Sequence, residues 1–92
     1  MNKNHKKAYE ELKAAGVPVF INPDNSESFC VDGENYSKDG TLYADFYSVG
    51  FNAKEKGLND HDGVHPKVTA ILDKYNLYCE WRDPGSLSVW DN

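Results

Sequence analysis

Residues 66–90 read PKVTAILDKYNLYCEWRDPGSLSVW and contain the clearest structural signals in the chain. After Pro66, which suits a first helical position, apolar side chains recur at helical spacing: Val68, Ile71, Leu72 and Tyr75. From residue 77 the sequence is rich in aromatic and β-branched residues and is interrupted by a Pro-Gly pair. This stretch therefore predicts a helix, a strand at 77–82, a type II turn at 83–86 in which Gly85 takes a positive φ, and a strand at 87–90.

The N-terminal third repeats this alternation of helix and hairpin. A helical stripe of His5, Ala8, Tyr9, Leu12 and Ala15 predicts a helix over residues 4–15 that stops at Gly16. Two short β-rich runs follow at 17–21 and 28–32, with turn residues between them. We expect these two runs to form a hairpin.

The middle of the chain holds the longest strand candidate, residues 41–51, in which alternate residues would form two faces: Leu42, Ala44, Phe46 and Ser48 on one, and Tyr43, Asp45, Tyr47 and Val49 on the other. Residues 52–65 lack any period and are rich in Gly, Asn and Asp, so they predict a loop. The resulting order is αβββαββ. We therefore predict a single α+β domain spanning residues 1–92, with an antiparallel sheet of about five strands and two helices on one face.

Such a sheet leaves one face without helices. If Leu42, Ala44 and Phe46 face the helices together with Leu77, Cys79 and Trp81, the alternate residues point the other way. The uncovered face would then hold Tyr43, Tyr47, Tyr78, Glu80 and Arg82, beside Trp90. Tyr and Trp are enriched in binding hot spots, so this face is a candidate docking site. The alternative is that the tyrosines only stabilise the sheet by cross-strand pairing, or that a loop covers them.

Acidic residues gather in the middle of the chain. The formal net charge is −5, but residues 1–16 carry +2, residues 17–53 carry −5 and residues 54–92 carry −2. A block of this kind repels free duplex DNA and attracts surfaces rich in Lys and Arg, including those that grip phosphate. The alternative is that the acids only keep a small protein soluble.

The cysteines and the hydropathy of the chain indicate the cellular compartment of the protein. Cys30 and Cys79 both lie in apolar, strand-like surroundings, which favours free core thiols over a disulfide. No apolar run has the length of a membrane helix, and the Lys-rich start is not followed by the apolar stretch of a signal peptide. These features predict a cytoplasmic protein without a membrane partner.

Potential metal ligands concentrate at Asp60, His61, Asp62 and His65. They allow a small metal-dependent hydrolase or metal-binding regulator as a second hypothesis. The structural alternative is that the acids shape the loop while Asp62 or His65 caps the helix at Pro66. No nucleophile elbow, phosphate loop or His-Glu-x-x-His motif is present, so we expect a non-enzymatic protein without metal or cofactor.

The overall character of the chain, with its αβββαββ order, the acidic block from Asp24 to Asp45 and the aromatic ending at 77–90, resembles that of anti-CRISPR proteins of phages and mobile elements. These proteins share no signature motif, and the ten basic residues here depart from full DNA mimicry. The resemblance implies binding to a CRISPR surveillance complex, on its basic protein surface or its guide RNA, with loss of target-DNA binding.

We therefore expect an inhibitor or adaptor that binds a host protein or ribonucleoprotein complex. A phage structural component, which would self-assemble, is a further alternative. The residues expected to contact the partner are Tyr43, Asp45, Tyr47, Tyr78, Glu80, Arg82, Asp32, Glu34 and Asp39.

Overall fold

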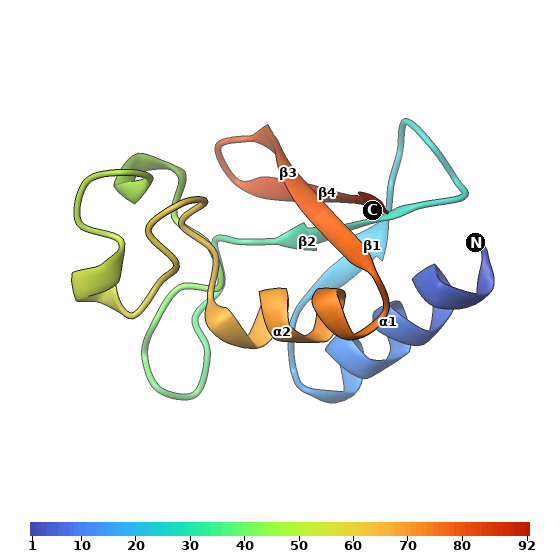
Figure 1. Cartoon of the computed structure of the whole chain (residues 1–92), viewed down its shortest axis with the longest axis horizontal. Helices are drawn as coiled ribbons and strands as arrows, with labels where there is room; N and C mark the ends of the chain where they lie inside the picture. Colours follow the sequence, from blue (N-terminus) through green and yellow to red (C-terminus); the bar gives the residue numbers. More distant parts are fainter.

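The computed structural model describes residues 1–92 as a four-stranded antiparallel sheet with two helices (Figure 1). In chain order the elements are α1 (Lys3–Ala14), β1 (Val19–Ile21), β2 (Phe29–Asp32), α2 (Pro66–Lys74), β3 (Leu77–Asp83) and β4 (Ser86–Asp91). The strands lie in the order β1-β2-β4-β3, and every neighbouring pair is antiparallel. The predicted α+β class, the two helices and both hairpins are confirmed, whereas the fifth strand is absent.

Local chemistry explains where the helices begin and end. The side chain of Asn2 caps α1 by accepting a hydrogen bond from the backbone N–H of His5 at 2.9 Å. After α1, Gly16 takes a φ of +87°, which favours glycine. At α2, the ring Nδ1 of His65 accepts from the N–H of Lys67 at 3.1 Å, so the predicted capping role of His65 is confirmed. Neither helix has the length and apolar character needed to cross a bilayer.

Both helices pack on the same face of the sheet. The core cluster combines Ala8 and Leu12 of α1, Val68 and Leu72 of α2, and the inward side chains Phe29, Val31, Leu77, Leu87 and Val89 of the strands. Because side chains alternate along a strand, the residues between these point to the opposite face. Figure 1 shows that no helix covers that second face.

The predicted strand at 41–51 is wrong, because its backbone bonds to several different partners instead of one neighbouring strand. The N–H groups of Tyr43 and Ala44 donate to Asn35 and Gly33, while the N–H of Asp45 donates to the carbonyl of Gly63 at 2.8 Å. Immediately afterwards the chain turns into a short 3₁₀ helix, Phe46–Ser48. Residues 33–65 therefore form a long connection around one end of the sheet, with a second short 3₁₀ helix at Lys54–Lys56.

The turn between β3 and β4 also differs from the expectation. Gly85 does not take a positive φ, so the turn is not of type II. Instead, the carboxylate of Asp83 accepts a hydrogen bond from the N–H of Gly85 at 2.8 Å, and the ladder shifts register between Trp81 and Asp83. The turn therefore forms with the help of the Asp83 side chain and the register shift in the ladder, and it does not need a positive φ at Gly85.

Candidate partner-binding surface

The sheet face that carries no helix presents aromatic and charged side chains. We define the open sheet face by the side chains that alternation directs away from the helices: Phe20, Asp32, Tyr78, Glu80, Arg82 and Trp90. Tyr78 lies directly opposite Trp90 in the ladder and is 41% exposed. The sequence prediction that Tyr78, Glu80 and Arg82 share the face opposite the helices is thus confirmed.

Arg82 forms ion pairs across the open sheet face. Its Nε donates to Asp24 Oδ2 at 3.3 Å, and its Nη1 donates to Asp83 Oδ2 at 3.1 Å. The pKa of Asp83 lies below its ordinary value. The main cause is the hydrogen bond that its carboxylate accepts from Gly85, and the charge of Arg82 adds a smaller effect. Because Asp24 lies in the loop between β1 and β2, the guanidinium links that loop to β3.

Acids outnumber bases on and beside this face. Asp32 and Glu80 lie on it without an ion-pair partner, and Glu34 lies against Gly85 in the β3–β4 turn. The single guanidinium of Arg82 is already shared by two carboxylates. The potential on this side of the molecule is therefore negative.

A second group of exposed aromatic residues lies on the connection between β2 and α2. We call residues 46–51 the aromatic loop; its exposed apolar side chains are Phe46, Tyr47, Val49 and Phe51. Tyr47 is 79% exposed and Phe51 is 84% exposed. A cluster of large apolar side chains left in water is a recognised mark of an interaction site.

The aromatic loop is held by the side chain of Asp45. Its carboxylate accepts hydrogen bonds from the N–H of Tyr47 at 3.1 Å, from the hydroxyl of Ser48 at 2.8 Å and from Nζ of Lys56 at 2.9 Å. These bonds, that from Lys56 foremost, keep the pKa of Asp45 below its ordinary value. A further backbone bond joins the N–H of Gly50 to the carbonyl of Asp60 at 3.1 Å. Hydrogen bonds thus hold the loop from which the exposed rings project.

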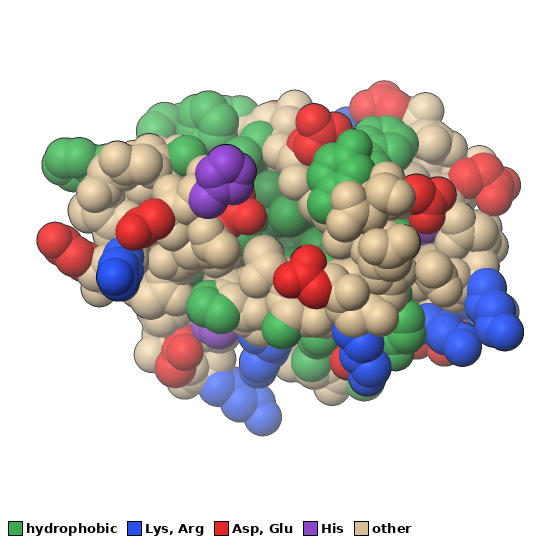
Figure 2. Space-filling view, in the orientation of Figure 1, with side chains coloured by type: hydrophobic (Ala, Val, Ile, Leu, Met, Phe, Trp, Pro, Cys, Tyr) green, Lys and Arg blue, Asp and Glu red, His purple; other side chains and the backbone are tan.

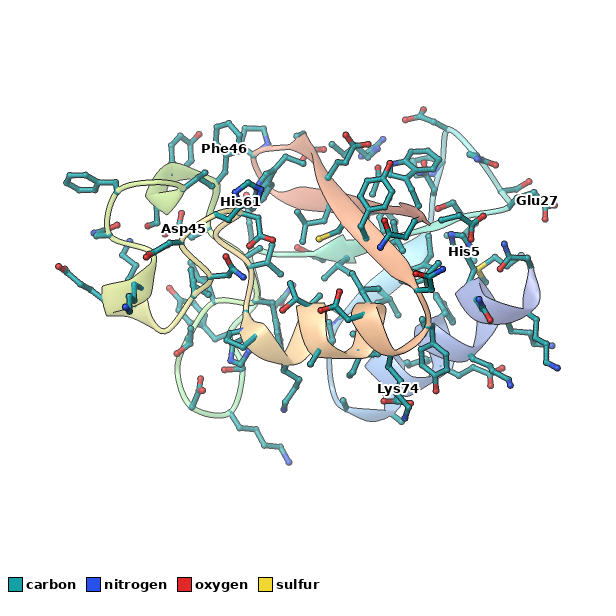
Figure 3. The ribbon with its side chains drawn as sticks, viewed as in Figure 1. His5, Glu27, Asp45, Phe46, His61 and Lys74 are labelled. Atoms are coloured by element: carbon teal, nitrogen blue, oxygen red, sulfur yellow. The ribbon has the colours of Figure 1, made fainter.

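The aromatic loop contacts the sheet through Phe46. Its ring packs edge-on against Trp81 with centroids 5.3 Å apart and against Tyr47 with centroids 5.6 Å apart. Trp81 is anchored in turn, because its indole N–H donates to the carbonyl of Asp62 at 2.9 Å. Figure 3 shows Phe46 and Asp45 beside the turn end of the β3–β4 hairpin. Because the side chain of Trp81 faces the helices, the aromatic loop contacts this end of the sheet on its helix-bearing side.

The structure does not bring all the predicted contact residues together. Tyr43 is only 3% exposed, in the core, and its hydroxyl donates to the carbonyl of Gly16, so the expectation of an exposed Tyr43 is wrong. Tyr47 is exposed, but in the aromatic loop and not on the sheet, because the chain leaves extended geometry after Asp45. Asp39 lies in a separate turn, where bonds from Ser37 and Thr41 lower the pKa of its carboxyl far below the usual range.

The proposed metal ligands serve as local backbone acceptors. Asp60 accepts from the N–H of Lys54 at 2.9 Å, Asp62 from Val64 at 3.0 Å, and His65 caps α2. His61 is exposed, and no group of three or more His, Cys, Asp or Glu side chains converges anywhere in the chain. The geometry thus gives no support to the metal-dependent hypothesis.

The two cysteines are free and lie on opposite faces of the sheet. Cys30 is buried opposite Ser88, whereas Cys79 points toward the helices. Burial raises the pKa of both thiols, that of Cys79 to about 12. A thiol with so high a pKa is a poor nucleophile at neutral pH.

The sequence patterns did not predict the exposure of Phe46, which was expected to face the helices, or of Phe51. The available signal was the Asp45-Phe-Tyr-Ser48 sequence, since an Asp followed three residues later by Ser favours a capped turn. No protein-family model matches the chain, and comparison with curated proteins and with solved structures finds no match either.

Proposed function

We propose that the chain is a non-enzymatic inhibitor or adaptor that binds a protein or ribonucleoprotein complex through the aromatic loop and the open sheet face. The main observation in support of the proposal is that Tyr47 and Phe51 are exposed on a loop whose conformation is held by hydrogen bonds to Asp45. Rigid exposed aromatic side chains lose little conformational entropy on binding and give large contact area.

The charge distribution indicates what kind of partner this surface fits. The lysines of α1, Lys3, Lys6, Lys7 and Lys13, lie on the helical side of the molecule, away from the open sheet face. Figure 2 shows most of the Lys side chains along that side. An acidic and aromatic surface suits a partner rich in Lys and Arg, which is the usual character of a protein surface that grips phosphate.

The most concrete form of this function is that of an anti-CRISPR protein. Carboxylates such as Asp32, Glu34 and Glu80 would compete with nucleic acid for basic residues, while the aromatic loop supplies the desolvated contact. Bound in this way, the chain would prevent an RNA-guided surveillance complex from engaging target DNA. The place of action would be the cytoplasm of the host cell.

A plasmid-interference assay tests this form of the proposal. The chain is expressed in bacteria carrying defined CRISPR systems, which are then transformed with a targeted or an untargeted plasmid. We expect that with one of the systems the targeted plasmid transforms as efficiently as the untargeted plasmid. If interference persists in every system of the panel, the anti-CRISPR function is wrong.

Variants test whether the aromatic loop makes the contact. We expect the double substitution Tyr47→Ser and Phe51→Ser to weaken capture of the inhibited complex by about tenfold or more, because central aromatic residues dominate binding energy. Tyr36→Ser is the matched control, since Tyr36 is 69% exposed but lies outside the aromatic loop. Equal capture by the double variant and the control would exclude the aromatic loop as the docking element.

A further inference from the structure

The outer edge of the sheet formed by β3 is unpaired. β3 is the last strand in the order β1-β2-β4-β3 and pairs only with β4. Outside that ladder, none of the backbone hydrogen bonds of the molecule involves residues 77–83. An unpaired edge of this length is a template on which an extended chain can add a strand.

The register shows which groups face outward from this edge. The N–H of Asn92 donates to the carbonyl of Asn76, so alternation directs the backbone groups of Tyr78 and Glu80 toward β4. The N–H and carbonyl groups of Leu77, Cys79 and Trp81 then point to the free edge. Their side chains face the helices, so any added residue opposite them would also direct its side chain toward the helices.

A hollow lies where those added side chains would go. It measures about 220 Å³ and lies between β3, α2 and the loop before α2. Its apolar lining comes from Leu72, Leu77, Tyr78 and Cys79, and Thr69 of α2 also lines it. Figure 2 shows the hollow near the middle of the visible face, and Figure 3 labels His61 beside it. The volume is below that of typical small-molecule sites and suits one or two aliphatic side chains.

Carboxylates that form no ion pair lie beside this edge. Asp62 and Asp73 line the hollow, and Glu80 projects from β3 on the open sheet face. None of the three forms an ion pair, and Asp73 accepts no side-chain hydrogen bond. All three lie near enough to Cys79 for their charges to contribute, after burial, to the raised pKa of its thiol. An occupant with basic side chains would satisfy them.

From the free edge, the hollow and the unpaired carboxylates together, we infer that the groove between β3 and α2 binds an extended partner segment in which aliphatic and basic side chains alternate. The segment adds to β3 as a fifth strand. Its aliphatic side chains opposite Leu77 and Cys79 enter the hollow, and its Lys or Arg side chains lie near Glu80 and, at the segment's ends, near Asp62 and Asp73. This groove is distinct from the aromatic loop and goes beyond the proposed function.

Titration with a defined peptide tests the inference. The probe is the acetylated and amidated peptide KVKLKVK, added to the ¹⁵N-labelled full chain while amide shifts are recorded. We expect saturable shifts at residues 77–83 and 69–73. The isomeric peptide KKVLVKK has the same charge but lacks alternation, and we expect it to bind at least about fivefold more weakly.

Two variants with the same net charge distinguish attraction of the peptide by the carboxylates beside the groove from attraction by the overall negative charge of the protein. Asp73→Lys should weaken binding of KVKLKVK about five- to tenfold, because it replaces an attractive charge beside the hollow by a repulsive one. Glu10→Lys makes the same change of net charge on the exposed side of α1 and should leave the affinity within about twofold of the original. Capture of a surveillance complex should be unaffected by Asp73→Lys, so this test and that of the proposed function fail independently.

Three results would overturn the inference. The first is equal binding of the two peptides, with shifts spread over the acidic surface. The second is an equal loss of affinity in Asp73→Lys and Glu10→Lys. The third is a free chain that sediments as a dimer with the β3 amides protected from hydrogen exchange, because a second copy would then occupy the edge.

Discussion

Asp45 illustrates how one side chain can decide the conformation of a whole segment. Its carboxylate is nearly buried, at 12% exposure, and accepts bonds from Tyr47, Ser48 and Lys56. A buried carboxylate with three donors competes effectively with a β ladder for the backbone of the next residues. The exposed aromatic side chains downstream therefore depend on an acid that is itself not free to contact a partner.

We expect Asp45→Ala to lower the free energy of unfolding by about 1–2 kcal/mol, the usual effect of losing a helix-capping acceptor. Amide exchange at Tyr47 and Ser48 should accelerate as their hydrogen bonds to Asp45 are lost. Urea unfolding and hydrogen exchange measure the two effects. Asp45→Asn keeps an acceptor oxygen and should fall between the two proteins; unfolding of Asp45→Ala indistinguishable from the parent chain would show that the carboxylate does not hold the loop.

The helices and hairpins could be predicted from the sequence by their regular periodicity, whereas pairing between distant segments of the backbone could not. The helices and both hairpins fall within about two residues of their predicted bounds, because caps, turn residues and apolar spacing are local signals. Residues 41–51 alternate like a strand, but Tyr43 and Asp45 bond to backbone groups of Asn35 and Gly63, which no local pattern encodes. The predicted aromatic face was consequently only half correct.

Gly63 provides the close approach on which this irregular pairing depends. It takes a φ of +71°, and a Cβ built there would lie 2.6 Å from the carbonyl oxygen of Asp45. Since that oxygen belongs to the backbone, it cannot move aside as a flexible side chain could. Only glycine therefore allows the loop before α2 to pack against Asp45.

We expect Gly63→Ala to destabilise the fold by about 2 kcal/mol or more, from left-handed strain and the clash together. Gly50→Ala is the matched control, because Gly50 has a φ of +69° but a Cβ added there would meet no atom within 4 Å. It should cost only about 1 kcal/mol. Thermal unfolding of the two variants measures the difference, and equal losses would contradict the close contact at Gly63.

For the whole molecule, carboxylates dominate the response to acid. Hydrogen bonds and ion pairs hold the pKa values of Glu11, Asp39, Asp45 and Asp83 below those of the unfolded chain, which are near 4.5 for Glu and 3.8 for Asp. Groups with a depressed folded-state pKa stabilise the fold above the unfolded value and lose that contribution as the pH falls through the folded value.

The urea midpoint should therefore be nearly constant from pH 7 to pH 5 and should decrease progressively below about pH 4.5. Asp45→Asn should show a smaller decrease, because it removes one of the four groups. A midpoint that rises on acidification to pH 3 would contradict these interactions.

The strand order has a consequence for how the chain folds. β2 pairs with β4, yet residues 33–85 separate them. Closing so long a loop costs entropy before the central ladder can form, so we expect slower folding than in helical domains of this size. During synthesis, the β1–β2 hairpin and α1 emerge well before the strand that completes their sheet. Until β4 leaves the ribosome, the apolar side of that hairpin can pack only against α1, so we expect part of it to stay exposed to solvent.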